Sequence, residues 1–282
     1  MDGQLPLQSF ASVGQNQTAV VGLETGPTYD EVHLEYNHDA TVGDEFDDSH
    51  ITGVRLNLNG EDIVDVKGED LSMVERYEGQ PGQNGYLTLS LREIIAKSFD
   101  GVNLTGLVTL PGDALSLEVD IGNGKATSGD PSLKGFAITS PARSVRQIIP
   151  TLKRFSFANS ATGPYEITTL PKGPAIKRMH FMTNNMDGLK LYRDRYKHYD
   201  LTKAQEEYLA KRYGRVPQAN VFHFDPIVDG WALAKMFMTD GAQSLIFNCD
   251  MSGTGSVPVL VEAIEGNLTS NAPSALPKGK RR

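Results

Sequence analysis

The chain has 282 residues, of which 39% are hydrophobic and 22% charged, and its formal net charge is −8. These values are ordinary for a soluble globular protein, and they exclude both a disordered chain and a generic nucleic-acid binder, whose footprint is a basic surface. The single cysteine, Cys249, excludes an internal disulfide and a cysteine-rich zinc module. We expect neither a membrane span, which needs ~18 apolar residues, nor a signal peptide.

Alternation of apolar and polar residues with a period of two dominates the first half of the chain. Residues 29–36, 54–58, 87–91 and 115–121 each place apolar side chains on one face and polar side chains on the other. Asn59-Gly60 follows the second of these segments, and this pair is the preferred two-residue hairpin turn. Such segments predict half-buried strands of antiparallel sheets.

Only two segments have a clear helical pattern. Apolar residues recur at helical spacing over residues 71–77, and Gly79 stands where a left-handed residue ends a helix. The second segment, Thr202–Tyr213, opens with the capping-box pair Thr202 and Gln205. We expect one face of this second helix to be lined by Leu201, Ala204 and Tyr208.

The two halves of the chain repeat one another at an offset of 135 residues. Gly53–Leu56 matches Gly188–Leu191, and the helix-ending Gly79 falls on Gly214 at the same offset. Three further strands correspond at this or a similar spacing: 86–89 with 221–224, 32–34 with 179–181, and 115–120 with 245–250. A period of this length is too long for a solenoid and indicates duplication of a whole domain.

Each half of the chain offers about eight short strand segments, and eight antiparallel strands in a domain of this size are typical of a two-sheet jelly roll. We therefore predict an all-β fold of two tandem eight-stranded antiparallel jelly rolls, each with a short helix in one connection between strands. The predicted domains are an N-terminal arm (1–14), a first roll (15–145), a second roll (146–266) and a flexible basic tail (267–282). Pro141 and Pro150 punctuate the chain at the boundary between the rolls.

The histidines and the cysteine form no catalytic pattern. His33, His180 and His223 lie on the polar faces of predicted strands, where we expect exposed side chains, and they lack the spacing of a helical metal site. The chain has no nucleophile elbow, P-loop or dinucleotide fingerprint, and Cys249 is expected to be a structural thiol. We therefore predict a protein that is not an enzyme and that requires no cofactor.

One predicted loop has the composition of a metal site. Asp44, Glu45, Asp47 and Asp48 lie within five residues, and calcium prefers clustered oxygen ligands on flexible loops. The spacing does not match an EF-hand, so a solvated acidic loop is the alternative. These four residues are the candidate calcium site.

Basic residues gather at the end of the chain. Lys278, Lys280, Arg281 and Arg282 follow a stretch that contains proline and serine. A solvated tail is one interpretation. The other is a tether to anionic lipid or nucleic acid, in which each cation contributes about 1 kcal/mol.

Two stretches also suggest a family. Gly26–Leu34 and Ile51–Gly60 resemble the opening strands of the major capsid proteins of corticovirus-type marine bacteriophages, and the order of the following helix, strand and second half is similar. The resemblance covers about residues 15–265. It implies a double jelly roll and a structural protein of a tailless icosahedral virus with an internal membrane.

The resemblance also implies partners. In such viruses the chain forms a homotrimer whose six rolls make a pseudo-hexagonal capsomer, and calcium has a role in particle stability. The implied partners are neighbouring capsomers, a penton or vertex protein, membrane-associated virion proteins and lipid headgroups of the internal membrane, with no specific nucleic acid. The implied location is the virion, after assembly in the host bacterial cytoplasm. Two similar domains also suit a threefold object in a sixfold position by symmetry alone.

Two other functions remain open at this point, because jelly rolls serve several purposes. A carbohydrate-binding β-sandwich, such as a lectin or a receptor-binding spike, needs exposed aromatic rings. The only tryptophan, Trp231, lies in the segment Trp231–Met238, which we predict to be a buried strand. A jelly-roll enzyme of the cupin type needs a histidine cluster on facing strands.

Overall fold

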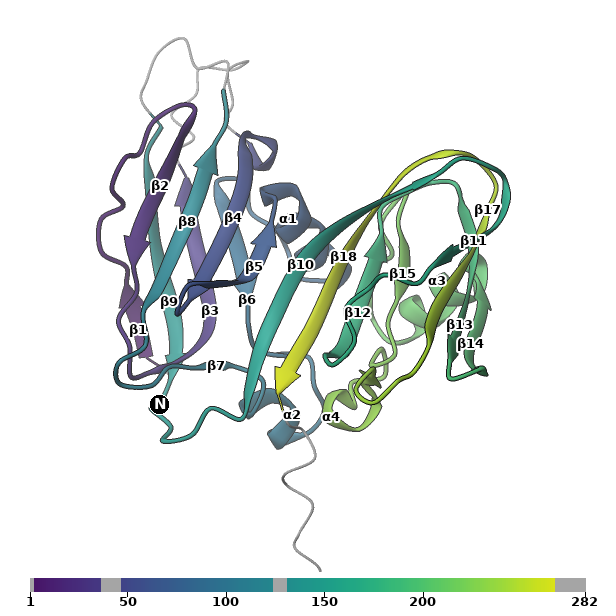
Figure 1. The fold of residues 1–282 in the computed structure, drawn as a ribbon. Coiled ribbons are helices and arrows are strands. Elements are labelled where there is room, and N and C mark those ends of the chain that lie inside the picture. The colour runs from purple at the N-terminus through teal and green to yellow at the C-terminus, as the bar shows by residue number, and fades with distance from the viewer. Residues whose placement is uncertain (1–2, 37–46, 124–130, 267–282) are drawn as a thin grey trace, which may run out of the picture.

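The computed structural model describes residues 3–36, 47–123 and 131–266 of the chain. Two β-sandwiches lie side by side, one formed by β1–β9 and the other by β10–β18, and we refer to them as the first roll and the second roll (Figure 1). Within the described ranges, no helix is long and apolar enough to span a bilayer.

The elements of the first roll are β1 (Gly3–Pro6), β2 (Gln17–Gly22), β3 (Thr28–Tyr36), the 3₁₀ helix η1 (Asp48–His50), β4 (Ile51–Leu58), β5 (Glu61–Val66), α1 (Gly68–Tyr77), β6 (Tyr86–Ser90), α2 (Phe99–Asn103), β7 (Leu107–Val108), β8 (Leu115–Ile121) and β9 (Leu133–Ser140). The first roll contains the predicted strands and the predicted helix in their expected order, and it adds β1, η1 and α2, which the sequence did not predict.

The second roll repeats this series except for the 3₁₀ helix. Its elements are β10 (Ile148–Asn159), β11 (Gly163–Ile167), β12 (Ala175–Phe181), β13 (Met186–Arg193), β14 (Tyr196–Thr202), α3 (Lys203–Arg212), β15 (Phe222–Phe224), α4 (Ala232–Lys235), β16 (Phe237–Met238), β17 (Leu245–Met251) and β18 (Gly255–Gly266).

The strand order of the two rolls is the same. The first roll has the orders β1-β9-β3-β6 and β2-β8-β4-β5, and the second has β10-β18-β12-β15 and β11-β17-β13-β14. Each segment pair matched at the sequence level occupies the same position in its sheet: β4 and β13, β6 and β15, β3 and β12, β8 and β17. The predicted double jelly-roll fold is confirmed.

One sheet runs through both rolls. β10, the first strand of the second roll, pairs in parallel with β5, with Leu152 opposite Val64 and Lys153 opposite Asp65. The segment predicted as an N-terminal arm also enters a sheet, because Gly3–Pro6 pairs with β9 as an antiparallel edge strand.

Side chains that alternate toward the space between the two sheets form the core of each roll. β8 and β17 show the same strict alternation of buried and half-buried residues. Each large apolar side chain that is fully buried contributes roughly 1.5–3 kcal/mol. The core of the first roll extends into the second through Leu152, Val221 and Leu260, so the two rolls share apolar contacts.

Both predicted helices are present, and each ends at a glycine with positive φ, Gly79 at 77° and Gly214 at 81°. The predicted face of the second helix is wrong, however. α3 buries Glu206 and Ala210 and exposes Ala204 and Tyr208. The buried face of α3 includes the carboxyl side chain of Glu206, and the hydrophobic pattern does not reveal that a glutamate is buried.

The prediction that Trp231–Met238 is a buried strand is also wrong. The segment forms the short helix α4 followed by a two-residue strand, and Trp231 is exposed at the start of that helix. Ala232 and Met236 are buried but Ala234 between them is exposed, which fits a helical turn, because a strand would place all three side chains on one face.

Candidate functional site

The junction between the rolls is built by the end of α1, which packs against the outer face of β12 and β15. Tyr77, the last residue of α1, is fully buried, and its ring stacks on His223 with 4.1 Å between ring centroids. Its hydroxyl donates to Asp225 Oδ2 at 3.2 Å, and its carbonyl accepts from the Val216 N–H at 2.9 Å. One helix end of the first roll is thus held by three segments of the second.

A buried group of charges surrounds this contact, and we call it the junction cluster. Its members are Glu78 and Glu93 from the first roll and Lys177, Arg178, Asp225 and Glu262 from the second. The Arg178 guanidinium is fully buried and contacts four carboxylates. Its Nη1 lies 3.0 Å from both Glu78 and Glu262, its Nη2 contacts Glu93, and its Nε lies 3.4 Å from Asp225.

The electrostatics of the junction cluster follow from burial and from the two cations. Burial raises the pKa of Glu78 to about 7, although Arg178 opposes this rise. Burial also acts against ionisation of Glu262, but the charges of Arg178 and Lys177 outweigh it and hold the pKa of that carboxyl well below its usual range. Because a buried charge that loses its partner costs about 3–5 kcal/mol, the cluster ties the two rolls to one relative position.

Two histidines extend the junction cluster as a chain of hydrogen bonds. His223 Nε2 accepts from the Gln218 N–H at 3.0 Å, so the other ring nitrogen of His223 carries the proton and donates to His180 Nδ1 at 2.7 Å. His180 Nε2 then donates to Glu262 at 2.9 Å. Burial lowers the pKa of His223 to about 2. The prediction that these two histidines are exposed is wrong, because α1 covers their face of the sheet.

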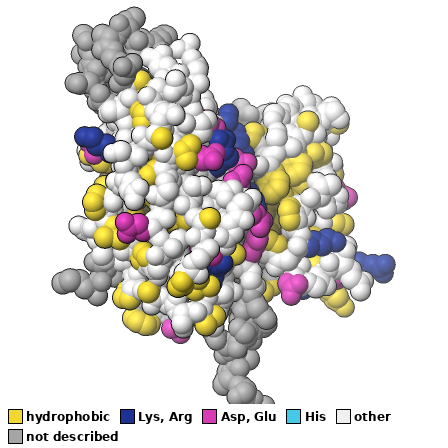
Figure 2. Space-filling model, turned by 60° about the vertical axis from the view of Figure 1, so that its left-hand side comes forward, with side chains coloured by type: hydrophobic (Ala, Val, Ile, Leu, Met, Phe, Trp, Pro, Cys, Tyr) yellow, Lys and Arg dark blue, Asp and Glu magenta, His cyan; other side chains and the backbone are white. Residues whose placement is uncertain are grey.

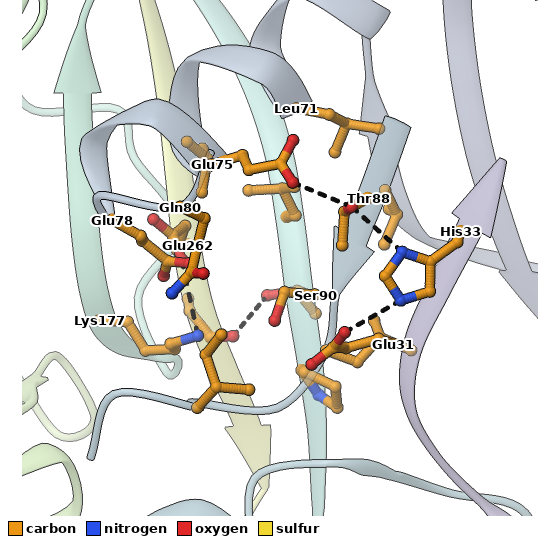
Figure 3. A pocket seen from close by; sticks show the side chains of 18 of the residues that line it. Glu31, His33, Leu71, Glu75, Glu78, Gln80, Thr88, Ser90, Lys177 and Glu262 are labelled. Atoms are coloured by element: carbon orange, nitrogen blue, oxygen red, sulfur yellow. Dashed lines mark hydrogen bonds and ion pairs between the residues drawn. The ribbon is translucent and has the colours of Figure 1, made fainter. Parts of the chain in front are cut away.

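A cavity of about 240 Å³ lies beside the junction cluster, and both rolls line it (Figure 3). On the side of the first roll, Glu31 Oε2 lies 3.0 Å from His33 Nε2, and His33 Nδ1 lies 3.2 Å from the Thr88 hydroxyl. Thr88 in turn donates to Glu75 Oε1 at 3.1 Å, and burial raises the pKa of Glu75. His33 is half-buried rather than exposed.

The candidate calcium site falls only partly within the described residues. Asp47 caps η1, where its Oδ1 accepts from the Ser49 N–H at 3.0 Å and lies 2.9 Å from His50 Nδ1. Asp44 and Glu45 lie outside the described residues, as do Lys278, Lys280, Arg281 and Arg282 of the basic tail. Across the described part of the chain, no group of three or more histidine, cysteine or acidic side chains could hold a metal ion. The calcium site stays a prediction.

The surface has acidic side chains along the boundary between the rolls and scattered hydrophobic patches (Figure 2). The exposed aromatic side chains among the described residues are Phe99, Trp231 and three tyrosines, Tyr196, Tyr208 and Tyr213. Cys249 is buried, and burial raises the pKa of its thiol to about 12, which fits a structural thiol.

Comparison with known families matches both rolls. A family model described as the viral coat protein P2 N-terminal domain matches residues 4–141, and the model of the viral coat protein P2 C-terminal domain matches residues 149–267. The chain belongs to the viral coat protein P2 family. The corticovirus-type resemblance predicted from the sequence is confirmed.

Individual relatives agree with this assignment. This chain is 24% identical over 268 residues to the major capsid protein P2 of Pseudoalteromonas phage PM2. The match covers 92% of this chain and 95% of the relative. The crystal structure of the bacteriophage PM2 protein matches with a TM-score of 0.83 at 21% identity, over 95% of this chain and 98% of that one.

More distant viruses share the fold. A chain of Sulfolobus Turreted Icosahedral Virus matches with a TM-score of 0.68 at 12% identity, over 95% of this chain and 92% of that one. The Faustovirus major capsid protein matches with a TM-score of 0.60 at 7% identity, over 94% of this chain and 90% of that one. The family gives the coat protein a structural role in a viral capsid, and these comparisons support that role rather than the carbohydrate-binding alternative.

Proposed function

We propose that the coat protein assembles as a homotrimer whose six rolls form a pseudo-hexagonal capsomer of an icosahedral shell. The observation that carries this proposal is the identical strand order of the two rolls within one chain. Three copies then present six similar lobes, so a threefold particle fits a position with six neighbours.

The same proposal assigns the contacts that such a shell needs. Each capsomer contacts neighbouring capsomers and a penton or vertex protein, and its inner side meets membrane-associated proteins or lipid headgroups of an internal membrane, after assembly in the host cytoplasm. The basic tail (Lys278, Lys280, Arg281 and Arg282) is the segment whose charge suits an anionic headgroup. The protein has no catalytic role and requires no cofactor in this proposal.

Sedimentation of the purified chain tests the assembly state. A permanent capsomer buries more than ~2,000 Å² between its subunits and therefore stays intact at micromolar concentration. We expect a single species of about 92 kDa, three times the 30.7 kDa of one chain. A monodisperse monomer at micromolar concentration would contradict the proposal.

A further inference from the structure

The junction inside the chain has a counterpart contact that a single chain does not make. In the junction, β10 of the second roll pairs with β5 of the first, and the end of α1 packs against the outer face of β12 and β15. The equal strand orders make β1 the counterpart of β10, β14 that of β5, and α3 that of α1. The same contact with the roles of the two rolls exchanged would therefore join β1 of a first roll to β14 of a second roll.

Both of these strands are free edges of their sheets in the described part of the chain. β1 ends one sheet and pairs with β9, while β14 ends another and pairs with β13. Leu5 on β1 is 38% exposed, and most residues of β14 are exposed, including Tyr196. An unpaired edge of this kind is a template for pairing with another chain, and proteins normally cover it.

We propose that a second copy of the coat protein repeats the junction: β1 of one copy pairs in parallel with β14 of the next copy. In the same contact, α3 of that next copy packs against the outer face of β3 and β6. This inference rests on the proposed trimer and names the surfaces that hold it together. The contact is head-to-tail, and three copies related by a threefold axis close it into a ring in which no copy keeps these edges free.

The internal repeat also fixes the register of the proposed pairing. His33 on β3 and His180 on β12 are counterparts. The strand pairings that lead from β3 through β9 to β1, and from β12 through β18 to β10, then make Leu5 the counterpart of Lys153. At the offset of 135, Asp200 is the counterpart of Asp65. Since Lys153 lies opposite Asp65 within the chain, Leu5 of one copy lies opposite Asp200 of the next.

The charges of the two surfaces are complementary. The last turn of α3 carries Lys211 and Arg212, both exposed, and the outer face of β3 carries Glu31 and Glu35. Inside the chain the ion pair at this contact has the opposite polarity, with Glu78 just after the end of α1 and Arg178 on β12. At the offset of 135, Lys211 and Arg212 correspond to Arg76 and Tyr77 of α1.

Apolar side chains support the same assignment. Tyr208 and Tyr213 are exposed on α3 and at its end, and Phe136 stacks on His33 at 4.6 Å on the outer face of the first roll. Aromatic side chains with a basic neighbour are the residues that protein interfaces favour, whereas exposed aromatic rings are unfavourable in water. A second copy would bury these rings.

A disulfide cross-link tests the register directly. The variant Leu5→Cys with Asp200→Cys places two cysteines at the proposed pair, where facing strand residues have the separation that a disulfide needs. The matched control is Val20→Cys with Asp200→Cys, because Val20 lies on another edge strand and is 37% exposed. The native Cys249 is fully buried and does not interfere.

The expected result after mild oxidation is a covalent trimer on a denaturing gel for the Leu5 variant, in at least tenfold excess over the control, with reversal by a thiol. If the native mass is that of a trimer but the Leu5 variant cross-links no better than the control, the proposed pairing is wrong while the trimer stands. If the native mass is that of a monomer, the proposed function fails as well.

A charge reversal tests the helix contact without cysteines. Lys211→Glu with Arg212→Glu should raise the trimer dissociation constant at least tenfold, because like charges would then meet Glu31 and Glu35. Adding Glu31→Lys and Glu35→Lys should restore most of the affinity. If the variant with all four substitutions dissociates as readily as the variant with only Lys211→Glu and Arg212→Glu, α3 does not face β3.

Discussion

His33 and His180 occupy the same place in the two rolls, on the third strand of the sheet, yet their surroundings differ. His33 pairs across the sheet with Thr88, is half-buried and faces the cavity. His180 pairs across the sheet with His223 and is fully buried beneath the end of α1. The strand pattern is the same in both, so the difference comes from the neighbouring roll that covers one of the two faces.

The charges beside each histidine match this difference. Glu31 stands where the second roll has Arg178, and the acidic side chain remains partly solvated whereas the arginine is matched by four carboxylates. Duplication has supplied one surface twice, and substitution has adapted one copy to a contact within the chain.

Removal of the central cation should have the largest effect. Arg178→Met leaves buried carboxylates without their partner, and we expect the free energy of unfolding to fall by about 3–5 kcal/mol. Arg55→Met is the matched control on the solvated face of β4, where Arg55 pairs with Glu118 and Asp120 and a loss of about 1 kcal/mol or less is expected. Denaturant unfolding of both variants measures the difference. Equal losses would mean that the junction cluster does not hold the rolls together.

The buried carboxyl of α3 should have the next largest effect. Glu206 occupies the position that Leu71 holds in α1, and burial raises its pKa to about 7. Because the folded pKa lies above the unfolded value of 4.5, the parent loses stability as the pH rises from about 5 to 8, by about 2.5 kcal/mol. Glu206→Gln should remove this loss, so the variant becomes the more stable form at pH 8. If the free energy of unfolding changes with pH by the same amount in both proteins across this range, the assignment is wrong.

Acid should act through the histidine pair in the opposite direction. The folded pKa of His223 is lowered to about 2 from 6.5, so its stabilising contribution is present above pH 6.5 and is lost as the pH falls below that value. Between pH 7 and pH 5 the loss amounts to about 2 kcal/mol. His223→Gln keeps a donor and an acceptor but does not titrate, so the difference in unfolding free energy between parent and variant should shrink by this amount at pH 5. A constant difference would show that His223 is not held neutral in the fold.

The fold was predictable from the sequence because period-two alternation and glycine-ended helices are local signals. The segments 53–56 and 188–191 reveal the duplication for the same reason. The buried histidines were missed because β12 alternates as a solvent-facing strand does, and its polar side chains are covered only when the other roll is in place. Trp231 was misassigned because a short apolar run does not distinguish a strand from a helical turn.

The acidic connection of the first roll should have the smallest effect. In the second roll, residues 182–185 join the equivalent strands without any carboxylate, whereas the first roll has Asp44, Glu45, Asp47 and Asp48 in this connection. If these carboxylates bind calcium, the ion removes their mutual repulsion, and millimolar calcium should raise the thermal midpoint of the parent by about 2 °C.

Asp47→Asn with Asp48→Asn should abolish most of that rise. Asparagine keeps the cap that Asp47 provides to η1, so the fold without calcium should be unchanged. Glu61→Gln with Asp62→Asn, in the exposed β4–β5 hairpin, controls for the loss of two surface charges and should respond to calcium as the parent does. Thermal scans with and without calcium compare the three proteins. If calcium shifts the midpoint of the Asp47 and Asp48 variant as far as that of the parent, the acidic connection is solvated and the ion binds elsewhere.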